Sequence, residues 1–383
     1  MEWTFGVDAL SCLSCSVTAD LAASQCSACG GALTVSYPDG SVPTSPTKPP
    51  GDGIWRWAPW LPVIPLDHRA RRPGATPLTT SRWLSELTGA TVLVKDEGAN
   101  PTGSVFDRGL TLATAAAALL EVHSVDLVAT GTDGVAAAAG AAAAGLDCSV
   151  TVPTRAPFVA KALINVHGGA MTVTGGRVTD ALDAHQSGGS YSLHPARTPF
   201  RREGWKTLYL DLIADLDWTA PSHLVVPIGT GLGVTALAAC ANDCVAAGLV
   251  DEVPRLIAAQ PYDCAPIVKA IERGESSVEP WSRPDTVVGD LEWPDPACGA
   301  EAAAGVRGSD GIGIAVPDPA TMEAAVRLAD RDGLAIGLAG GVAAAAATEL
   351  DGLTPDDTVV VLNPSAGRFD ADLLRSHLMA SGE

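Results

Sequence analysis

Short β-rich runs alternate with helical runs from about residue 72 onward, and this alternation constrains the fold more than any other feature of the 383-residue chain. Such alternation is typical of βαβ units and of mainly parallel sheets. Because the β-rich runs lack strict polar alternation, we expect helices on both faces of each sheet. The expected strands cover residues 125–130, 148–153, 170–174, 223–228, 255–260 and 358–363. The expected helices cover residues 135–144, 157–166, 178–185, 234–247, 264–272 and 371–380.

The first part of the chain differs in composition from the rest. Residues 1–36 contain a cluster of four cysteines. Residues 37–73 are rich in Pro, Ser, Thr and Trp, which predicts an irregular, extended connector.

The charge balance excludes some partners. A net charge of −20 argues against nucleic acid and against anionic membranes, since both require basic patches. An acidic surface with few lysines suits high salt, where screening removes self-repulsion, so we expect a halophilic source. An acidic protein of an ordinary cell is the alternative.

Nothing in the sequence predicts secretion or a membrane span. The first residues lack a basic region and a long apolar stretch, so we expect a soluble, cytoplasmic protein. The alanine runs at 115–118, 136–144 and 343–347 are too short or too interrupted to span a bilayer. They predict closely packed, buried helices.

The early cysteines form two CxxC pairs. Cys12 and Cys15 make the first pair and Cys26 and Cys29 the second, and ten residues separate the two pairs. Two such pairs supply four thiolates to a tetrahedral zinc ion. The alternatives are a degenerate ribbon or a pair of disulfides, and a reducing cytosol disfavours disulfides. A four-cysteine site has no open coordination position, so the predicted zinc is structural.

A glycine-rich loop follows the expected strand 223–228. It consists of Gly229, Thr230, Gly231, Leu232 and Gly233, and it opens an alanine-rich helix. Free backbone N–H groups and the helix dipole at such a position favour a phosphate. The motif alone is weak, because a dinucleotide site or a plain tight turn has a similar sequence.

Several motifs together resemble the threonine synthase family. Residues 94–109 read VKDEGANPTGSVFDRG, close to the family's VKDEGxNPTGSFKDRG, and residues 74–78 read GATPL, close to GxTPL. VPIGTGLG resembles the family's phosphate loop, and residues 254–260 resemble the strand after it. The CxxC pairs and WAPWLP resemble the start of members that carry a zinc ribbon. The resemblance implies an α/β fold-type II pyridoxal-phosphate (PLP) enzyme, similar to the tryptophan synthase β subunit, with two lobes of open sheet and an N-terminal zinc ribbon.

The resemblance fails at the residue that carries the chemistry. In threonine synthases PLP forms a Schiff base with the lysine of GSFKDR, and the substrate is O-phosphohomoserine. A lysine amine is required because the cofactor acts as an electron sink only as an imine. Here Phe106 occupies that position, and phenylalanine has neither a nucleophile nor a proton to transfer.

Other positions of the family's cofactor site have changed too. Thr132 replaces the asparagine of the SSGN loop, which contacts the PLP ring oxygen in the family. The stretch 337–341 reads GLAGG where the family has a serine-bearing segment similar to EPSSA. In the end-segment 362–370, Asn363 or Ser365 stands where the family places the residue facing the pyridine nitrogen.

No other residue is an obvious replacement for the lysine. Lys95 accompanies the Schiff-base lysine in the family, and Lys161 matches a family lysine on a small-lobe helix, so neither is expected to rescue imine formation. Asp133, His194 and His223 are candidates for a new base. Each has a simpler interpretation, as a helix N-cap, a loop residue and a strand-edge residue respectively.

We therefore expect a zinc-ribbon-like unit at 1–36, a connector at 37–73, a large lobe at 74–110 and 189–383, and a small lobe at 111–188.

The leading hypothesis is a non-catalytic protein that retains phosphate or non-covalent PLP binding, or that pairs with an active homologue as a regulatory subunit. A homo- or heterodimer is expected from the family. One alternative is a PLP-dependent lyase with a divergent site, acting on a phosphohomoserine-like amino acid. The other is a structural or interaction protein with an empty pocket.

Overall fold

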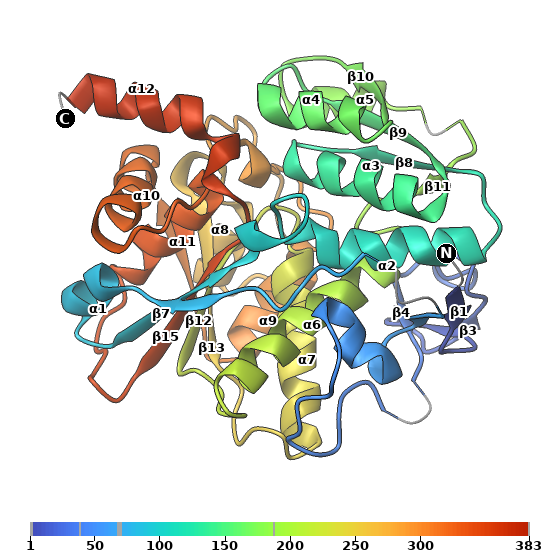
Figure 1. The fold of residues 1–383 in the computed structure, drawn as a ribbon, viewed down its shortest axis with the longest axis horizontal. Helices are drawn as coiled ribbons and strands as arrows, with labels where there is room; N and C mark the ends of the chain where they lie inside the picture. Colours follow the sequence, from blue (N-terminus) through green and yellow to red (C-terminus); the bar gives the residue numbers. More distant parts are fainter. Residues whose placement is uncertain (1–2, 38–39, 67–70, 187, 382–383) are drawn as a thin grey trace.

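The computed structural model describes residues 3–37, 40–66, 71–186 and 188–381. Two α/β lobes, each built on its own sheet, lie side by side, and the N-terminal segment packs beneath them (Figure 1). The expectation of helices alternating with mainly parallel strands is confirmed.

The large lobe contains a sheet of six strands in the order β14-β13-β12-β15-β7-β6. All neighbours in this sheet are parallel except β6 and β7, which are antiparallel. The strands are β6 (Leu78–Thr80), β7 (Thr91–Asp96), β12 (His223–Pro227), β13 (Arg255–Pro261), β14 (Ile312–Val316) and β15 (Thr358–Asn363). The helices are α1 (Arg82–Thr88), α2 (Phe106–Leu119), α6 (Phe200–Asp215), α7 (Leu232–Ala246), α8 (Pro266–Arg273), α9 (Gly299–Gly308), α10 (Asp318–Asp332), α11 (Leu338–Ala347) and α12 (Ala371–Ser381).

Both faces of this sheet are covered, as the apolar strands predicted. Along β12, Leu224 and Val226 pack into one hydrophobic core while Val225 packs into the other. The alternation follows from the two-residue period of a strand, which sends successive side chains to opposite faces. The second core includes α11, whose ten residues are all buried, so the prediction of a buried alanine helix is confirmed there.

The small lobe contains a parallel sheet of four strands in the order β10-β9-β8-β11. Its strands are β8 (Ser124–Val128), β9 (Asp147–Val152), β10 (Ala170–Val173) and β11 (Tyr191–Ser192). Its helices are α3 (Thr132–Ala144), α4 (Phe158–Val166) and α5 (Val178–Ala184). Strand β11 also belongs to this sheet, although it lies beyond residue 188, where the sequence analysis ended the small lobe.

The N-terminal segment is made of short antiparallel strands. β1 (Trp3–Phe5) pairs with β5 (Val63–Pro65), and β2 (Leu10–Cys12) lies between β3 (Thr18–Ala19) and β4 (Leu33–Val35). The connector is not simply extended, because residues Gly53–Trp60 form a 3₁₀ helix. This helix buries Ile54 and Trp57, and the Trp57 indole donates a 2.8 Å hydrogen bond to Asp211 of α6. Burial of these side chains gives the Trp-rich stretch a defined structure.

The start of α3 and several whole helices were not anticipated. α3 begins at Thr132, three residues before the expected start, and α6, α9 and α10 were not identified from the sequence. Among the described residues, no helix is both long enough and apolar enough to cross a membrane.

Candidate functional site

A small cavity lies between the lobes, beyond the carboxyl ends of β12 and β15. Pro227 and Pro364, which follow or end these strands, line it together with Asp133 of the small lobe. In open α/β sheets this position is where ligands bind. The cavity has a volume of about 40 Å³, whereas pockets for small ligands measure roughly 300–1,000 Å³. Side chains therefore occupy most of the space that a ligand would need.

Phe106 is one of the side chains that fill this space. It is the first residue of α2, and its ring meets the Trp205 indole edge-on, with centroids 6.4 Å apart and planes at 79°. The guanidinium carbon of Arg201 lies 6.0 Å from the centre of the Phe106 ring. The position before it is fixed, since the Val105 N–H donates to the Pro364 carbonyl at 2.8 Å. The site thus holds an aromatic cluster where a lysine amine was required.

The frame around Phe106 is a buried ionic network. Arg108 donates to Glu97 at 2.7 Å and to Asp211 at 2.8 Å, and all three side chains are almost fully buried. Burial alone raises the pKa of Glu97, but the neighbouring Arg108 outweighs it and lowers that pKa overall. Asp107 accepts hydrogen bonds from the backbone N–H and the hydroxyl of Thr102, which fixes the loop before α2. The motif's structural residues are therefore in place although its reactive residue is not.

The glycine loop lies at the start of α7 and borders the same cavity. Gly231 has a φ of +88°, a left-handed conformation that glycine adopts without strain. A Cβ at Gly229 would lie 2.8 Å from Trp293, and a Cβ at Gly233 would lie 2.8 Å from Trp205. The first N–H groups of α7 have no partner within the helix. Thr230 also lines the cavity, whereas Leu232 lines a neighbouring one.

Thr132, expected at the ring-contact position, is already engaged. Its hydroxyl donates to Asp290 at 2.7 Å, and the Thr130 hydroxyl donates to the same carboxylate at 3.2 Å. Burial raises the pKa of Asp290, although these hydroxyls oppose the shift. Asp290 comes from the large lobe, so its two hydrogen bonds tie the lobes together.

Asn363 and Ser365 flank the cavity without lining it. The Asn363 amide donates to Asp96 at 2.7 Å, and its carbonyl oxygen is buried without a hydrogen-bond partner. Ser365 lies against Gly337, where a Cβ would be only 2.5 Å from the serine oxygen. Pro364, between them, faces the cavity. Neither Asn363 nor Ser365 therefore lines the cavity.

A larger cleft of about 300 Å³ opens beside this cavity, between the lobes. Its charged lining residues are Arg155, Arg177, Asp290, Glu292, Arg368, Asp370 and Asp372. Glu292 of the large lobe accepts hydrogen bonds from Arg155 at 2.9 Å and from Arg177 at 2.5 Å, both in the small lobe. Burial raises the pKa of Asp370 to about 7. The cleft shares Asp290 and Ala339 with the small cavity.

Among the described residues, no lysine lines the cavity or the cleft. Lys95 is fully buried and donates to the Thr76 carbonyl at 2.7 Å and to Asp215 at 2.9 Å. Lys161, on α4, donates to the Thr154 carbonyl at 2.9 Å. Both amines have structural partners, which agrees with the expectation that neither replaces the missing one.

Of the three candidate bases, only Asp133 borders the cavity. It lies in the first turn of α3 and not at the N-cap, and its carboxylate accepts from the N–H groups of Thr130, Gly131 and Gly134. Burial and the nearby Asp290 raise the pKa of Asp133 to about 6. His223 begins β12, and His194 lines a separate cavity in the small lobe. The two histidines are thus excluded from this site.

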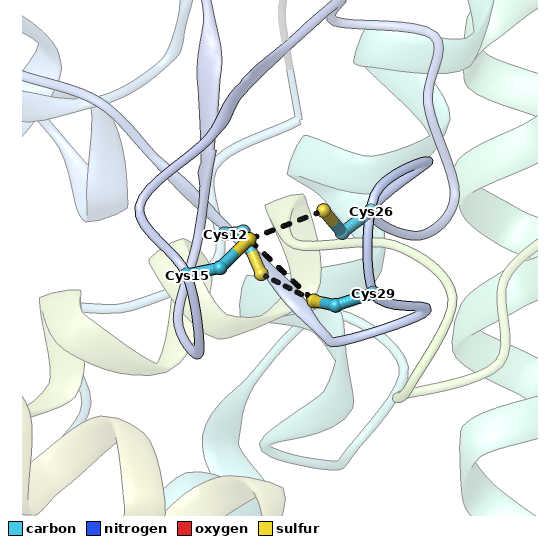
Figure 2. Close-up of side chains that lie close together, drawn as sticks. All are labelled: Cys12, Cys15, Cys26 and Cys29. Carbon is cyan, nitrogen blue, oxygen red and sulfur yellow. Dashed lines mark hydrogen bonds between the residues drawn. The ribbon is translucent and has the colours of Figure 1, made fainter.

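The four cysteines converge, as their spacing predicted. Figure 2 shows their sulfur atoms facing one another across two loops, and all four lie within 4.8 Å of each other. The Cys12–Cys29 and Cys15–Cys29 sulfur distances are both 3.5 Å, and Cys15–Cys26 is 3.6 Å. Tetrahedral zinc with ~2.3 Å bonds separates its sulfurs by ~3.8 Å. Backbone N–H groups of Cys15 and Ser14 lower the pKa of Cys12 to about 6, whereas at Cys15 and Cys29 the neighbouring thiols outweigh the backbone hydrogen bonds and raise the pKa. The cluster therefore fits a metal ion with four thiolate ligands.

Comparisons with known proteins agree with this architecture. The family model described as "Pyridoxal-phosphate dependent enzyme" matches residues 70–365. The threonine synthase of Methanosarcina acetivorans is 30% identical over 85% of this chain and 83% of its own length. That of Methanocaldococcus jannaschii is 29% identical over 90% and 88%. The chain belongs to the threonine synthase family of PLP-dependent enzymes.

Solved structures of the same fold class support the assignment of the fold. A fungal L-serine ammonia-lyase from Rhizomucor miehei superposes with a TM-score of 0.70 at 19% identity, covering 80% of this chain and 98% of that one. The Escherichia coli diaminopropionate ammonia lyase gives a TM-score of 0.67 at 15% identity, covering 82% and 89%. At these identities the likeness concerns the fold alone. The predicted fold-type II architecture is confirmed.

The residues of this chain do not fit the cofactor after which the family is named. A covalent imine requires an amine at the position of Phe106, and the ring there packs on Trp205. The remaining volume of about 40 Å³ is far below that of a ligand pocket. Thr132, the replacement for the ring-contact asparagine, is bonded to Asp290. We therefore derive no reaction step through PLP.

Sequence reasoning missed the residues that close this site. Trp205 belongs to α6, a helix that was not identified, and Trp293 and Asp290 belong to an irregular segment between α8 and α9. None of the three lies in a recognised motif. The abundance of tryptophan, with nine in the chain, was the one available signal.

Proposed function

We propose that this chain is a non-catalytic member of the threonine synthase family, in which the cofactor site has become part of the hydrophobic core. The observation that carries the proposal is Phe106, the first residue of α2, packed on Trp205 at the position of the Schiff-base lysine. A benzene ring forms no imine and transfers no proton. The lysine amine with which the family's reaction begins is therefore missing at position 106.

The packing around Phe106 supports this proposal independently. Trp205 covers Gly233 and Trp293 covers Gly229, so both indoles lie against the glycine loop. Trp205 and Trp293 are 6% and 4% exposed. Aromatic side chains of this size stabilise a core substantially, because each buries a large apolar area. Restoring a full cofactor pocket would require displacing them.

A weaker, non-covalent capacity for anions is part of the proposal. The N-terminal N–H groups of α7 remain unpaired within the helix, and Arg368 lines the neighbouring cleft. A small phosphorylated ligand is the class of molecule that these groups favour. Such binding would be reversible, since no amine is present to tether an aldehyde.

We also propose that the cysteine cluster holds one structural zinc ion. The supporting observations are the convergence of Cys12, Cys15, Cys26 and Cys29 and the absence of any fifth ligand position among the described residues. Zinc in such a site stabilises the surrounding loops and takes no part in catalysis.

The experiment compares the wild-type chain with Phe106→Lys and, as a matched control without an amine, Phe106→Leu. Each protein is mixed with PLP, treated with borohydride and analysed by visible absorbance and by mass. We expect no retained imine absorbance and no fixed adduct for the wild type and for Phe106→Leu. A borohydride-fixed pyridoxyl group on any lysine of the wild-type chain would overturn the proposal.

One observation favours the divergent lyase as a second candidate function. Asp133 lines the cavity and has a pKa of about 6, within the range of a working general base. The measurement is phosphate release from O-phosphohomoserine with added PLP, in the wild type and in Asp133→Asn. Turnover that depends on Asp133 would establish this candidate. If neither PLP nor phosphohomoserine changes the melting temperature, the interaction protein with an empty pocket is favoured.

A further inference from the structure

A further cavity, separate from the cofactor site, is a groove between α10 and α12 at the edge of the large lobe. Its volume is about 890 Å³, within the range of pockets for small molecules. Figure 1 shows α12, the last helix of the chain, beside α10 at the outer end of this lobe. A space of this size between two helices is unusual, because packed elements normally leave few voids larger than a water molecule.

One face of α12 forms a wall of the groove. The residues of this helix that line it are Ala371, Leu374, Arg375 and Leu378. Their spacing of three, four and seven residues places them on one side of a helix. No residue from Ala371 to Ala380 is buried. The apolar side chains of α12 are therefore left partly exposed along the groove.

Small apolar side chains form the opposite wall. Val326 and Ala329 come from α10, and Ala335 and Ile336 come from the segment that follows it. Val326 is half-buried, and Ala329 and Ala335 are exposed. An alanine side chain is too short to fill the space below α12. The groove thus has two apolar walls, and burial of an apolar chain between them is favourable.

Two arginines of the groove carry a positive charge without an acidic partner. Arg368 and Arg375 are both exposed, and among the described residues neither forms an ion pair. The Arg368 guanidinium donates to the Thr102 carbonyl at 2.8 Å, and a neutral acceptor does not compensate its charge. Both charges are therefore available to an anion in the groove.

The other two charged residues of the groove have partners of opposite sign. Arg327 pairs with Glu323, one turn earlier on α10, at 2.7 Å. Asp330 lies 3.7 Å from Arg331. With three arginines and one aspartate, the groove carries a net positive charge in a chain whose total charge is −20.

We propose that this groove binds a single-chain amphipathic anion, an alkyl carboxylate of medium length. The alkyl chain lies between the apolar walls of α10 and α12. The carboxylate accepts hydrogen bonds from the guanidinium of Arg375, and Arg368 supplies a second positive charge on the same groove. The ligand is non-covalent, and no bond is made or broken.

Other occupants satisfy only part of this surface. An inorganic anion would pair with the arginines but leave the apolar walls in contact with water. A neutral or cationic alkyl chain would cover the walls but leave the arginine charges without a counterion. A second copy of the chain, docked through the same face, would bring its own arginines against these, and like charges in an interface repel.

An occupant would give α12 the packing partner that it lacks. Leu374 and Leu378 are half-buried and would lose their remaining exposure. A molecule that binds only the folded chain also stabilises it by mass action. None of this depends on the proposed loss of catalysis, because the groove lies outside the cofactor site.

The test measures calorimetric binding of alkyl carboxylates to the full chain, each below the concentration at which it forms micelles. We expect decanoate to bind, and the affinity to rise about fourfold for each methylene added between octanoate and decanoate, because each methylene is buried. Acetate has the charge without the chain, and decylammonium has the chain with the opposite charge. Each should bind at least tenfold more weakly than decanoate.

Two variants of α12 locate the site, each with a matched control. Arg375→Gln removes a positive charge, and Leu374→Glu places a carboxylate in the apolar wall, so each should reduce decanoate affinity at least tenfold. Arg283→Gln alters an exposed arginine outside the groove. Met379→Glu changes a side chain of α12 that is 72% exposed and does not line the groove. Both controls should leave the affinity unchanged.

Sedimentation velocity with and without decanoate tests a second copy as the occupant. A wild-type dimer that Leu374→Glu converts to a monomer would overturn the inference, because the partner copy would then cover the groove. It is overturned equally if decanoate does not bind, if decylammonium binds as well, or if Arg375→Gln keeps full affinity. Should Leu374→Glu fail to fold, Arg375→Gln still decides, because Arg375 is exposed.

Discussion

The cysteine cluster keeps all the residues expected of its site, whereas the cofactor cavity has lost the residue that its chemistry requires. In the cluster, all four expected ligands are present and their sulfurs lie within 4.8 Å of one another. In the cavity, the expected fold and loops are present, but Phe106, Trp205 and Trp293 occupy the space. The cysteine cluster therefore fits a zinc ion, whereas the cavity does not fit PLP.

This difference teaches that the frame of the site and its chemistry are separable. Arg108, Glu97 and Asp211 hold the start of α2 by buried ionic contacts that do not involve the cofactor. Phe106 then adds apolar packing where an amine would have needed a partner. The buried ionic frame and the apolar core therefore hold the start of α2 in place without a lysine at position 106.

The largest expected effect comes from emptying the cysteine cluster. Removing zinc with a strong chelator, or changing Cys12→Ser, should release the segment 1–36, because apparent zinc affinities in small domains reach about 10–16 kcal/mol. Metal content and limited proteolysis of the full chain measure this. Cys298→Ser, outside the cluster and half-buried, serves as the control and should keep one zinc per chain. The comparison would be contradicted if the chain purified without metal and if the chelator left its proteolysis pattern unchanged.

The frame around the altered cavity provides the next largest effect. Arg108→Leu leaves the carboxylates of Glu97 and Asp211 buried without their partner, which should destabilise the chain by about 3–5 kcal/mol in urea unfolding. Arg283→Leu changes an exposed arginine and should cost less than about 0.5 kcal/mol. Equal costs for the two variants would mean that the frame does not support the fold as described.

The smallest expected effect is a pH dependence at the edge of the cleft. Burial raises the folded-state pKa of Asp370 to about 7, above its unfolded value of about 3.9. The stabilisation from the protonated form is therefore fully present below about pH 4 and is lost as the pH rises through 7. Asp370→Asn keeps an acceptor for the Leu338 N–H, at 2.8 Å.

This variant should raise the melting temperature at pH 8 and change it much less at pH 4. Asp372→Asn, at an exposed neighbouring position, is the control and should show no such dependence. If Asp370→Asn lowers stability equally at both pH values, the carboxylate has a role that its burial does not explain.

Much of the fold and part of the site were predictable from the sequence. The strand 358–363 was placed to the residue, and the other five expected strands lie within one or two residues of their observed bounds. The glycine loop and the cysteine pairs were also found, because each is a short pattern with a local physical cause.

The closure of the cavity was not predictable in the same way. Trp205 lies 99 residues from Phe106 in sequence and Trp293 lies 64 residues from Gly229, and each contact forms only when separate elements pack together. The pairing of Thr132 with Asp290 spans 158 residues. No local pattern encodes contacts at such separations.

By itself, the sequence determined the alternating elements, the four thiolates and the loss of the amine, since each depends on residue identity within a short window. Only the tertiary structure decided that indoles pack around Phe106 and that Thr132 of the small lobe is hydrogen-bonded to Asp290 of the large lobe. The physical reason is that side-chain packing and charge proximity depend on distances in space, which are set once the two sheets and the N-terminal segment have come together.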